Sequence, residues 1–144
     1  MKPRQLGQRP AKAEPAAQEA FTAEPLEPRL AAAQAGQRVV FCMDAAPCVY
    51  APFLALVWGV TRVLVKAPSG RQRLHVLAAL HATTKASVTV QHLPYVTAET
   101  VCELRRRLAG TYPAVPITIV LDKARYQKCV LVQALARSLG MELL

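Results

Sequence analysis

The stretch PITIVLDKARYQ, residues 116–127, determines the architecture that the sequence predicts. Its apolar run ITIVL carries no charge before Asp122, which is typical of a strand covered on both faces of a sheet. Asp122 follows at the carboxyl end of that strand, where open α/β sheets bind their ligands. A second apolar run, RVVFCMD at residues 38–44, ends in Asp44 in the same way. If these two strands are neighbours, both carboxylates lie at one rim of the sheet.

The remaining segments predict a mixed sheet flanked by helices. Residues 74–82 and 87–93 are two strands around a polar turn, and they predict an antiparallel hairpin. A helix follows, starting at Thr97 or Thr100 and ending near Gly110. The order of strand, hairpin, helix, strand, helix and strand start indicates an α/β domain. Its antiparallel strands come first, and its parallel strands follow through right-handed crossovers.

The two predicted helices have recognisable caps and stripes. Thr100 and Glu103 fit a capping box at the start of the first helix. The second helix is expected over residues 126–139, and a further strand begins at residues 141–144. Five apolar residues make up the expected buried stripe of this second helix: Val130, Leu131, Ala134, Leu135 and Leu139.

The amino-terminal part, residues 1–37, is predicted to be a tail and a connector. Residues 1–17 are rich in Pro, Ala, Gln and charge without an apolar period, which is typical of a mobile tail. The pattern then becomes helical, with a break expected at Pro25 and a stop at Gly36. A chain of 144 residues allows one domain, which we assign to residues 38–144.

The chain is basic, with a formal net charge of +9 and an isoelectric point near 9.9. From residue 38 onward it carries 13 Lys and Arg against 5 Asp and Glu, so the charge belongs to the folded part. A basic folded domain favours a polyanionic partner, with nucleic acid first and an anionic membrane surface second. Six basic residues are candidate DNA contacts: Arg71, Arg73, Arg105, Arg106, Arg107 and Lys128. For the three consecutive arginines, a solvated helix face is the simpler interpretation.

The cysteines and apolar runs predict a cytoplasmic protein that does not bind a membrane. Cys42, Cys48, Cys102 and Cys129 form no CxxC pair and are expected to be reduced and mostly buried. No zinc site is expected, because the three histidines do not combine with these cysteines at ligand spacing. No secretory signal peptide is expected. The longest apolar run, residues 45–60, contains two prolines and a glycine and is shorter than the ~20 residues of a membrane span.

Two aspartates at neighbouring strand ends can hold divalent cations. Carboxylate oxygens suit Mg²⁺ and Mn²⁺, and Mg²⁺ usually takes few protein ligands and fills its shell with water and phosphate. A pair of such ions would activate a water or a 3′-hydroxyl and stabilise the leaving oxygen of a phosphodiester. The alternative is structural, with Asp44 as a turn residue and Asp122 as a helix cap.

Three segments resemble one known family: VVFCMDAAPCVY at 39–50, KAPSGRQRLHVLAALHATT at 66–84, and residues 112–144. In order and spacing they are similar to bacterial insertion-sequence transposases related to the mariner superfamily. Residues 11–38 resemble that family's connector. The resemblance implies a DDE catalytic domain of ribonuclease-H-like fold, with Asp44 and Asp122 as its first two catalytic, metal-binding acids. It also implies Mg²⁺ or Mn²⁺ as cofactor and the DNA ends of a mobile element as partner.

The chain departs from the family pattern in several places. The third acid of the family is expected about 35 residues after Asp122, beyond Leu144, and the helix-turn-helix expected before the connector is also outside the sequence. The pattern therefore predicts a fragment truncated at both ends. Lys123 stands where asparagine is usual, and Pro47 where a histidine is usual. Three residues of the predicted hairpin also differ, and we interpret the histidines among them as substitutions and not as ligands: His75, Ala78 and His81.

Two functional interpretations follow. The first is a fragment of a DDE transposase that is inactive alone because its third acid is missing, with a sheet left incomplete at its carboxyl-terminal edge. The alternative is a non-catalytic remnant that binds DNA weakly through the six basic residues, or one half of a protein completed by a second reading frame, a partner chain or a dimer. In that case the exposed final strand would be the docking edge.

Overall fold

The computed structural model describes residues 14–50, 60–61, 64, 66, 72–92, 95–122 and 129–144. Residues 1–13 of the expected tail lie outside these residues, and so does nearly all of the segment between residues 51 and 66. For residues 15–17 the predicted tail is wrong, because they begin a helix over Pro15–Phe21.

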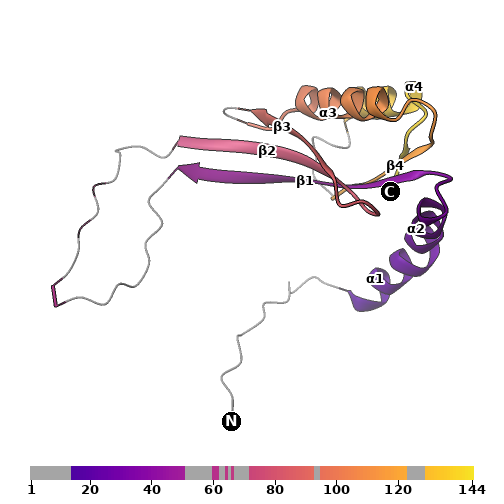
Figure 1. Ribbon diagram of the computed structural model, residues 1–144, viewed down its shortest axis with the longest axis horizontal. Helices are drawn as coiled ribbons and strands as arrows, with labels where there is room; N and C mark the ends of the chain where they lie inside the picture. Colours follow the sequence, from indigo (N-terminus) through magenta and orange to yellow (C-terminus); the bar gives the residue numbers. More distant parts are fainter. Residues whose placement is uncertain are drawn as a thin grey trace, which may run out of the picture.

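A five-stranded sheet forms the centre of the molecule (Figure 1). Its strands are β1 (Val39–Tyr50), β2 (Gln72–His81), β3 (Ser87–His92), β4 (Ile117–Val120) and β5 (Glu142–Leu143). They lie side by side in the order β3-β2-β1-β4-β5. β1, β2 and β3 are joined antiparallel, while β4 pairs parallel with β1, and β5 parallel with β4. The predicted hairpin, the parallel strand pair and the final strand are therefore confirmed.

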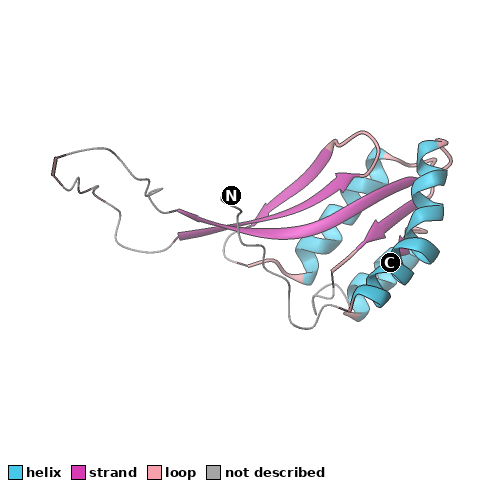
Figure 2. Ribbon diagram, turned by 90° about the horizontal axis from the view of Figure 1, so that it is seen from below, coloured by secondary structure: helices cyan, strands magenta, loops and turns pink. Residues whose placement is uncertain are grey.

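Helices cover both faces of this sheet. The described helices are α1 (Pro15–Phe21), the π-helical turn η1 (Thr22–Leu26), α2 (Glu27–Gln34), α3 (Ala98–Thr111) and α4 (Val130–Ser138). Figure 1 shows α3 and α4 above the sheet and α2 below it, and Figure 2 gives the view from below. The fold class is thus α/β with a mixed sheet, as predicted. None of the helices in the described part of the chain is long and apolar enough to cross a bilayer.

The core lies between the sheet and the helices α3 and α4. Alternate residues of β1 point to this side, and Val39, Phe41 and Met43 are all buried. From α3, Leu104 and Leu108 pack against them with no exposed surface. Each such side chain contributes roughly 1.5–3 kcal/mol on leaving water. This core fixes the position of β1 and β4 and, with them, the position of the two aspartates.

Strand β1 is longer than the sequence predicts. It does not end at Asp44 but continues to Tyr50, because β2 pairs with it along the whole length, from Phe41↔His81 to Tyr50↔Gln72. Pro47 does not interrupt this pairing. The backbone carbonyl of Val40 accepts the N–H of Ala82 on the β2 side. The backbone N–H and C=O groups of even-numbered β1 residues therefore face β2, and those of odd-numbered residues face the opposite edge of β1. The missing N–H of Pro47 therefore costs no bond to β2.

Helix α4 differs from its prediction in both start and face. Its N-cap is Cys129 and its first residue Val130, so it does not begin at residue 126. The expected stripe is wrong in three of its five positions, since Val130, Leu131 and Ala134 are exposed. Val132 and Ala136 are buried instead, with Leu135 and Leu139 packed beside them. Both sets have helical spacing, and only contact with α3 and the sheet distinguishes them.

Local capping explains where the other helices begin and end. Thr97 caps α3 through a reciprocal capping box with Thr100, so the proposed box between Thr100 and Glu103 is wrong. α3 also continues through Gly110 to Thr111. In the connector, the predicted break at Pro25 is a π-helical turn. The predicted stop at Gly36 is confirmed, since this glycine has a φ of +73°.

A carboxylate holds the connector against the sheet. Glu142 of β5 accepts hydrogen bonds from Arg29 of α2 through Nη2 at 2.5 Å and Nε at 3.1 Å. Its other oxygen accepts from Arg38 Nη1 at 2.6 Å and from Thr118 Oγ1 at 3.0 Å. These bonds lower the pKa of Glu142 to about 2, with the bond from Arg29 as the largest cause. The connector helix is thus tied to β1, β4 and β5 by one ionised side chain.

Candidate functional site

The two predicted acids follow two strands, β1 and β4, that pair in parallel. The recorded register runs from Val39↔Ile117 to Cys42↔Val120. The pairing and β4 both end at Val120, and Asp44 and Asp122 each follow two residues after the last pair. Paired strands lie about 4.8 Å apart, so we expect the two carboxylates to lie beyond the same end of this strand pair. Both residues are exposed, which suits a site that meets an external partner.

Asp44 is part of a continuing strand and does not stand at its end. It pairs with Ala78 of β2, and its Oδ1 accepts the N–H of Ala45 at 2.7 Å. Ala45 is an odd-numbered residue, so its N–H points to the side where β4 has already ended. The carboxylate satisfies this edge donor and is turned towards the β4 side by doing so. One oxygen of Asp44 is engaged in this way, and Oδ2 is the oxygen left to meet a cation.

Neither structural alternative for the two aspartates holds among the described residues. Asp44 is a strand residue and not a turn residue. Asp122 does not cap α4, because the N-cap of that helix is Cys129. The position of Asp44 therefore follows from the sheet.

The described residues offer a cation two carboxylates and no more. No group of three or more His, Cys, Asp and Glu side chains in metal-binding proximity occurs within the described ranges. Two carboxylates fit Mg²⁺ or Mn²⁺, because these hard ions accept oxygen ligands and complete their shells with water and phosphate oxygens. They do not fit the closed, four-ligand shell of a structural zinc ion.

The predicted DNA contacts divide into three groups. Arg73, Arg106 and Arg107 are exposed, as a contact to phosphate requires. Arg107 is already engaged, donating to Glu103 at 2.6 Å and to the carbonyl of Thr89 at 3.2 Å. The remaining candidates, Arg71 and Lys128, lie outside the described residues.

The prediction for Arg105 is wrong. This side chain has no exposed surface, so it belongs neither to a solvated helix face nor to an open phosphate contact. Its Nη1 donates to the carbonyl of Val132 in α4 at 2.7 Å. Burial lowers the pKa of its guanidinium, partly offset by the thiols of Cys102 and Cys129. The spacing contained a signal for this position, because Arg105 stands four residues after Val101 on the apolar stripe of α3.

His75 and His81 both lie against aromatic rings. His81 is buried beside Phe41, with ring centroids 5.2 Å apart. Its Nδ1 accepts the backbone N–H groups of Thr83 and Thr84 at 3.2 and 3.3 Å, which stabilises the turn between β2 and β3. His75 lies against Tyr95.

The cysteines are not mostly buried. Cys42 and Cys48 are exposed, Cys129 is half-buried and only Cys102 is buried. Burial raises the pKa of the Cys102 thiol, so this group stays protonated at neutral pH. All four are free thiols, as the sequence predicts.

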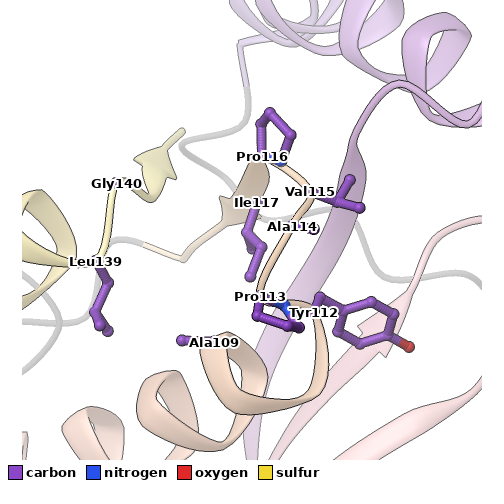
Figure 3. Close-up of a pocket in the computed structure, with 9 residues that line it drawn as sticks. All are labelled: Ala109, Tyr112, Pro113, Ala114, Val115, Pro116, Ile117, Leu139 and Gly140. Atoms are coloured by element: carbon purple, nitrogen blue, oxygen red, sulfur yellow. The ribbon is translucent and has the colours of Figure 1, made fainter.

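A hollow of about 330 Å³ lies at the far end of β4 from Asp122. Figure 3 shows its lining between the end of α3, the start of β4 and the segment after α4. The lining residues are Ala109, Tyr112, Pro113, Ala114, Val115, Pro116, Ile117, Leu139 and Gly140. None of them carries a charge. Apart from the phenol of Tyr112, the lining side chains have no group for acid–base or metal chemistry, and neither aspartate is among them.

The fold of this chain is similar to that of one chain in a retroviral complex. The chain matches a chain of the cryo-EM structure of the simian T-cell lymphotropic virus intasome in complex with the PP2A regulatory subunit B56 gamma, with a TM-score of 0.51 and 10% identity. The match covers 75% of this chain and 31% of that chain, so this chain spans less than a third of its structural neighbour. No protein-family model and no curated protein matches the sequence. The likeness is in keeping with a ribonuclease-H-like α/β fold, and at this identity it shows the fold alone.

Proposed function

We propose that residues 38–144 are part of the catalytic domain of a DDE transposase, which cuts and joins DNA with the help of Mg²⁺ or Mn²⁺. The observation that carries this proposal is the parallel pairing of β1 and β4, whose register leads to Asp44 and Asp122. The integrase-like fold supports the reaction class. The resemblance of the three sequence segments supports the finer assignment to insertion-sequence transposases related to the mariner superfamily.

The chain's part in this chemistry is to hold two carboxylates at a fixed spacing on an open surface. Asp44 and Asp122 would hold the cation, with Oδ2 of Asp44 as one ligand. When bound, the cation lowers the pKa of an attacking water and stabilises the leaving oxygen of the phosphodiester. Both acids follow residues that pack on the core: Met43 is buried, and Leu121 is packed against the same cluster. Their backbone positions are therefore set by the sheet, which reduces the cost of ordering the site.

No group of three acids in metal-binding proximity occurs among the described residues, so we propose that residues 1–144 alone cut DNA weakly or not at all. Loss of one member of a catalytic set reduces rates by several powers of ten. DNA contact itself depends on the exposed arginines, of which Arg73 and Arg106 have no ion pair among the described residues. We also propose a cytoplasmic location, without contact to a membrane.

The experiment is a nicking assay on supercoiled DNA with Mn²⁺, run beside a measurement of Mn²⁺ binding. Asp44→Asn and Asp122→Asn remove one ligand each, and Glu103→Gln is a matched control on the exposed face of α3. The proposal predicts that all nicking above background disappears in both aspartate variants and persists in the control. Absence of nicking together with Mn²⁺ bound at the aspartates fits the missing third acid. Nicking that survives Asp122→Asn, or no Mn²⁺ binding at all, contradicts the proposal.

A further inference from the structure

Strand β3 forms one edge of the sheet (Figure 1). It is the outermost strand in the order β3-β2-β1-β4-β5, and its pairing with β2 is regular from Leu80↔Ser87 to His75↔His92. Exposed edge strands of native proteins usually carry a lysine, a proline or a bulge that prevents pairing with another strand. β3 has none of these, since its sequence is SVTVQH and its register is uninterrupted. The edge of β3 can therefore accept a further strand.

Alternate residues of β3 turn their backbone groups away from β2. The N–H of His81 donates to the carbonyl of Ala86, so the hydrogen-bonded pairs of this hairpin contain the even-numbered residues of β3. The N–H and C=O groups of the odd-numbered residues therefore face outwards, and these residues are Ser87, Thr89 and Gln91. All of them are exposed, and in the part of the chain that the structure describes their N–H groups have no acceptor. The Thr89 carbonyl does accept a bond from outside the sheet, from Arg107 Nη1 at 3.2 Å.

The sequence of β3 is nearly symmetric about Thr89. Val88 and Val90 flank this residue, and the polar residues Ser87 and Gln91 follow on either side. A second copy of the strand can therefore pair antiparallel with the first, with Thr89 opposite Thr89 and Ser87 opposite Gln91. In this register every outward N–H meets an outward carbonyl, because each such pair exchanges both of its hydrogen bonds. Val88 then lies opposite Val90 on the side where both already pack on the core.

Helix α3 presents charges of both signs beside this edge. Arg107 reaches Thr89 and is paired with Glu103, one turn earlier on α3, at 2.6 Å. Arg105 contacts α4 instead, so Glu103 and Arg107 belong to the opposite flank of α3. A two-fold axis at Thr89 sets two copies of this flank antiparallel and brings Arg107 of each copy towards Glu103 of the other. This surface is thus complementary in charge to itself, as a symmetric dimer requires.

We propose that the outer edge of β3 is an interface for a second copy of this chain, and that two sheets join through it into one continuous sheet. The dimer has two-fold symmetry with Thr89 on the axis. Arg107 can keep its bond to the Thr89 carbonyl, because a carbonyl oxygen has two lone pairs. Asp44 and Asp122 are not part of this interface, so the proposal goes beyond the proposed function and does not depend on it. One strand pair and one helix flank make a small interface, and we expect a dissociation constant on the order of 10 μM.

The first test is sedimentation velocity of the full chain over a concentration series that spans this dissociation constant. A monomer–dimer equilibrium is expected. Thr89→Pro removes an outward N–H without breaking a bond to β2, so the variant should still fold and should dimerise at least about tenfold more weakly. Thr89→Val keeps the backbone donor and is the matched control, with an unchanged dissociation constant. A chain that stays monomeric throughout, or a dimer that Thr89→Pro leaves intact, would overturn the proposal.

Charge reversal tests the flank of α3. Arg107→Glu brings like charges together across the two-fold axis and should weaken the dimer several-fold. Adding Glu103→Arg restores opposite charges and should recover the affinity. Arg106→Glu changes the net charge equally on an exposed position of the same helix, and it is the control. An equal loss in Arg106→Glu, or no recovery in the double variant, contradicts the two-fold arrangement.

Hydrogen exchange in the unaltered protein avoids any effect of a substitution on folding. The amides of Val88 and Val90 are bonded to β2, so they should be protected at every protein concentration. Those of Thr89 and Gln91 should exchange fast in dilute solution and become protected as the dimer forms, along the sedimentation curve. Exchange at Thr89 that does not change with concentration, while the chain dimerises, would place the interface elsewhere and overturn the proposal.

Discussion

The bond network at Glu142 should contribute measurably to stability, and its contribution should disappear in acid. Glu142→Gln keeps the shape of the side chain but removes its charge. Arg29 and Arg38 then lose their shared anion, and Thr118 loses a charged acceptor. The connector helix α2 depends on this anchor, because among its described residues only Ala33 is buried.

The magnitude follows from the pKa of Glu142, which the bonds from Arg29, Arg38 and Thr118 lower from 4.5 to about 2. Such a shift corresponds to about 3 kcal/mol of stability at neutral pH. The carboxylate is 34% exposed, so solvent screening reduces the expected loss in Glu142→Gln to about 1–2 kcal/mol. Because the pKa is lower in the folded state, this contribution is complete above the unfolded pKa of about 4.5 and is lost as pH falls towards 2.

Urea unfolding of the unaltered protein and of Glu142→Gln, each at pH 7 and at pH 3, measures the contribution of the Glu142 charge to stability. The difference in unfolding free energy should be about 1–2 kcal/mol at pH 7 and less than half of that at pH 3. Glu103→Gln is the control, since its pair with Arg107 is exposed on both sides; it should cost about 0.3–0.5 kcal/mol. A difference that is the same at both pH values, or no larger than that of the control, would refute the reasoning.

Two pairs of substitutions and one single substitution test the helix assignments by urea unfolding. Val132→Ala should cost about 2 kcal/mol, because Val132 is fully buried, while Val130→Ala should cost almost nothing, because Val130 is 84% exposed; equal costs would contradict the assigned face of α4. Gly140→Ala should destabilise the protein by about 1 kcal/mol, since Gly140 has a φ of +64°. Gly110→Ala, inside α3, should stabilise it by up to about 1 kcal/mol. Changes of the same sign in both variants would contradict these backbone assignments. Thr97→Ala should cost about 1 kcal/mol by removing the N-cap of α3, and a cost near zero would show that the cap contributes nothing.

The parts of the fold that could be predicted depend on local sequence. The run before Asp122 and the hairpin around residues 82–86 have unambiguous apolar patterns and turn residues, and both appear as expected. Parallel pairing of β1 and β4 follows from the α3 crossover between them. The side-by-side arrangement of the two strands that precede Asp44 and Asp122 was therefore accessible from the sequence.

The parts that could not be predicted depend on distant partners. The extension of β1 beyond Asp44 requires the length of β2, which no local pattern contains. The buried face of α4 was ambiguous, because Val130 and Val132 both belong to stripes with helical spacing. Arg105 lies in a run of three arginines, and its burial results from contact with Val132, 27 residues away. A run of charged residues on a helix predicts an exposed face only where no second helix packs against that face.

The most direct test of the central claim is to locate bound Mn²⁺ by NMR. The ion broadens resonances near its binding site, so a titration of ¹⁵N-labelled protein maps the site without any requirement for activity. The account predicts that broadening begins around residues 43–45 and 120–122 and disappears in both Asp44→Asn and Asp122→Asn, while Glu103→Gln leaves it unchanged. Broadening that is centred elsewhere, or that survives either aspartate substitution, would contradict the claim that β1 and β4 build a shared metal site.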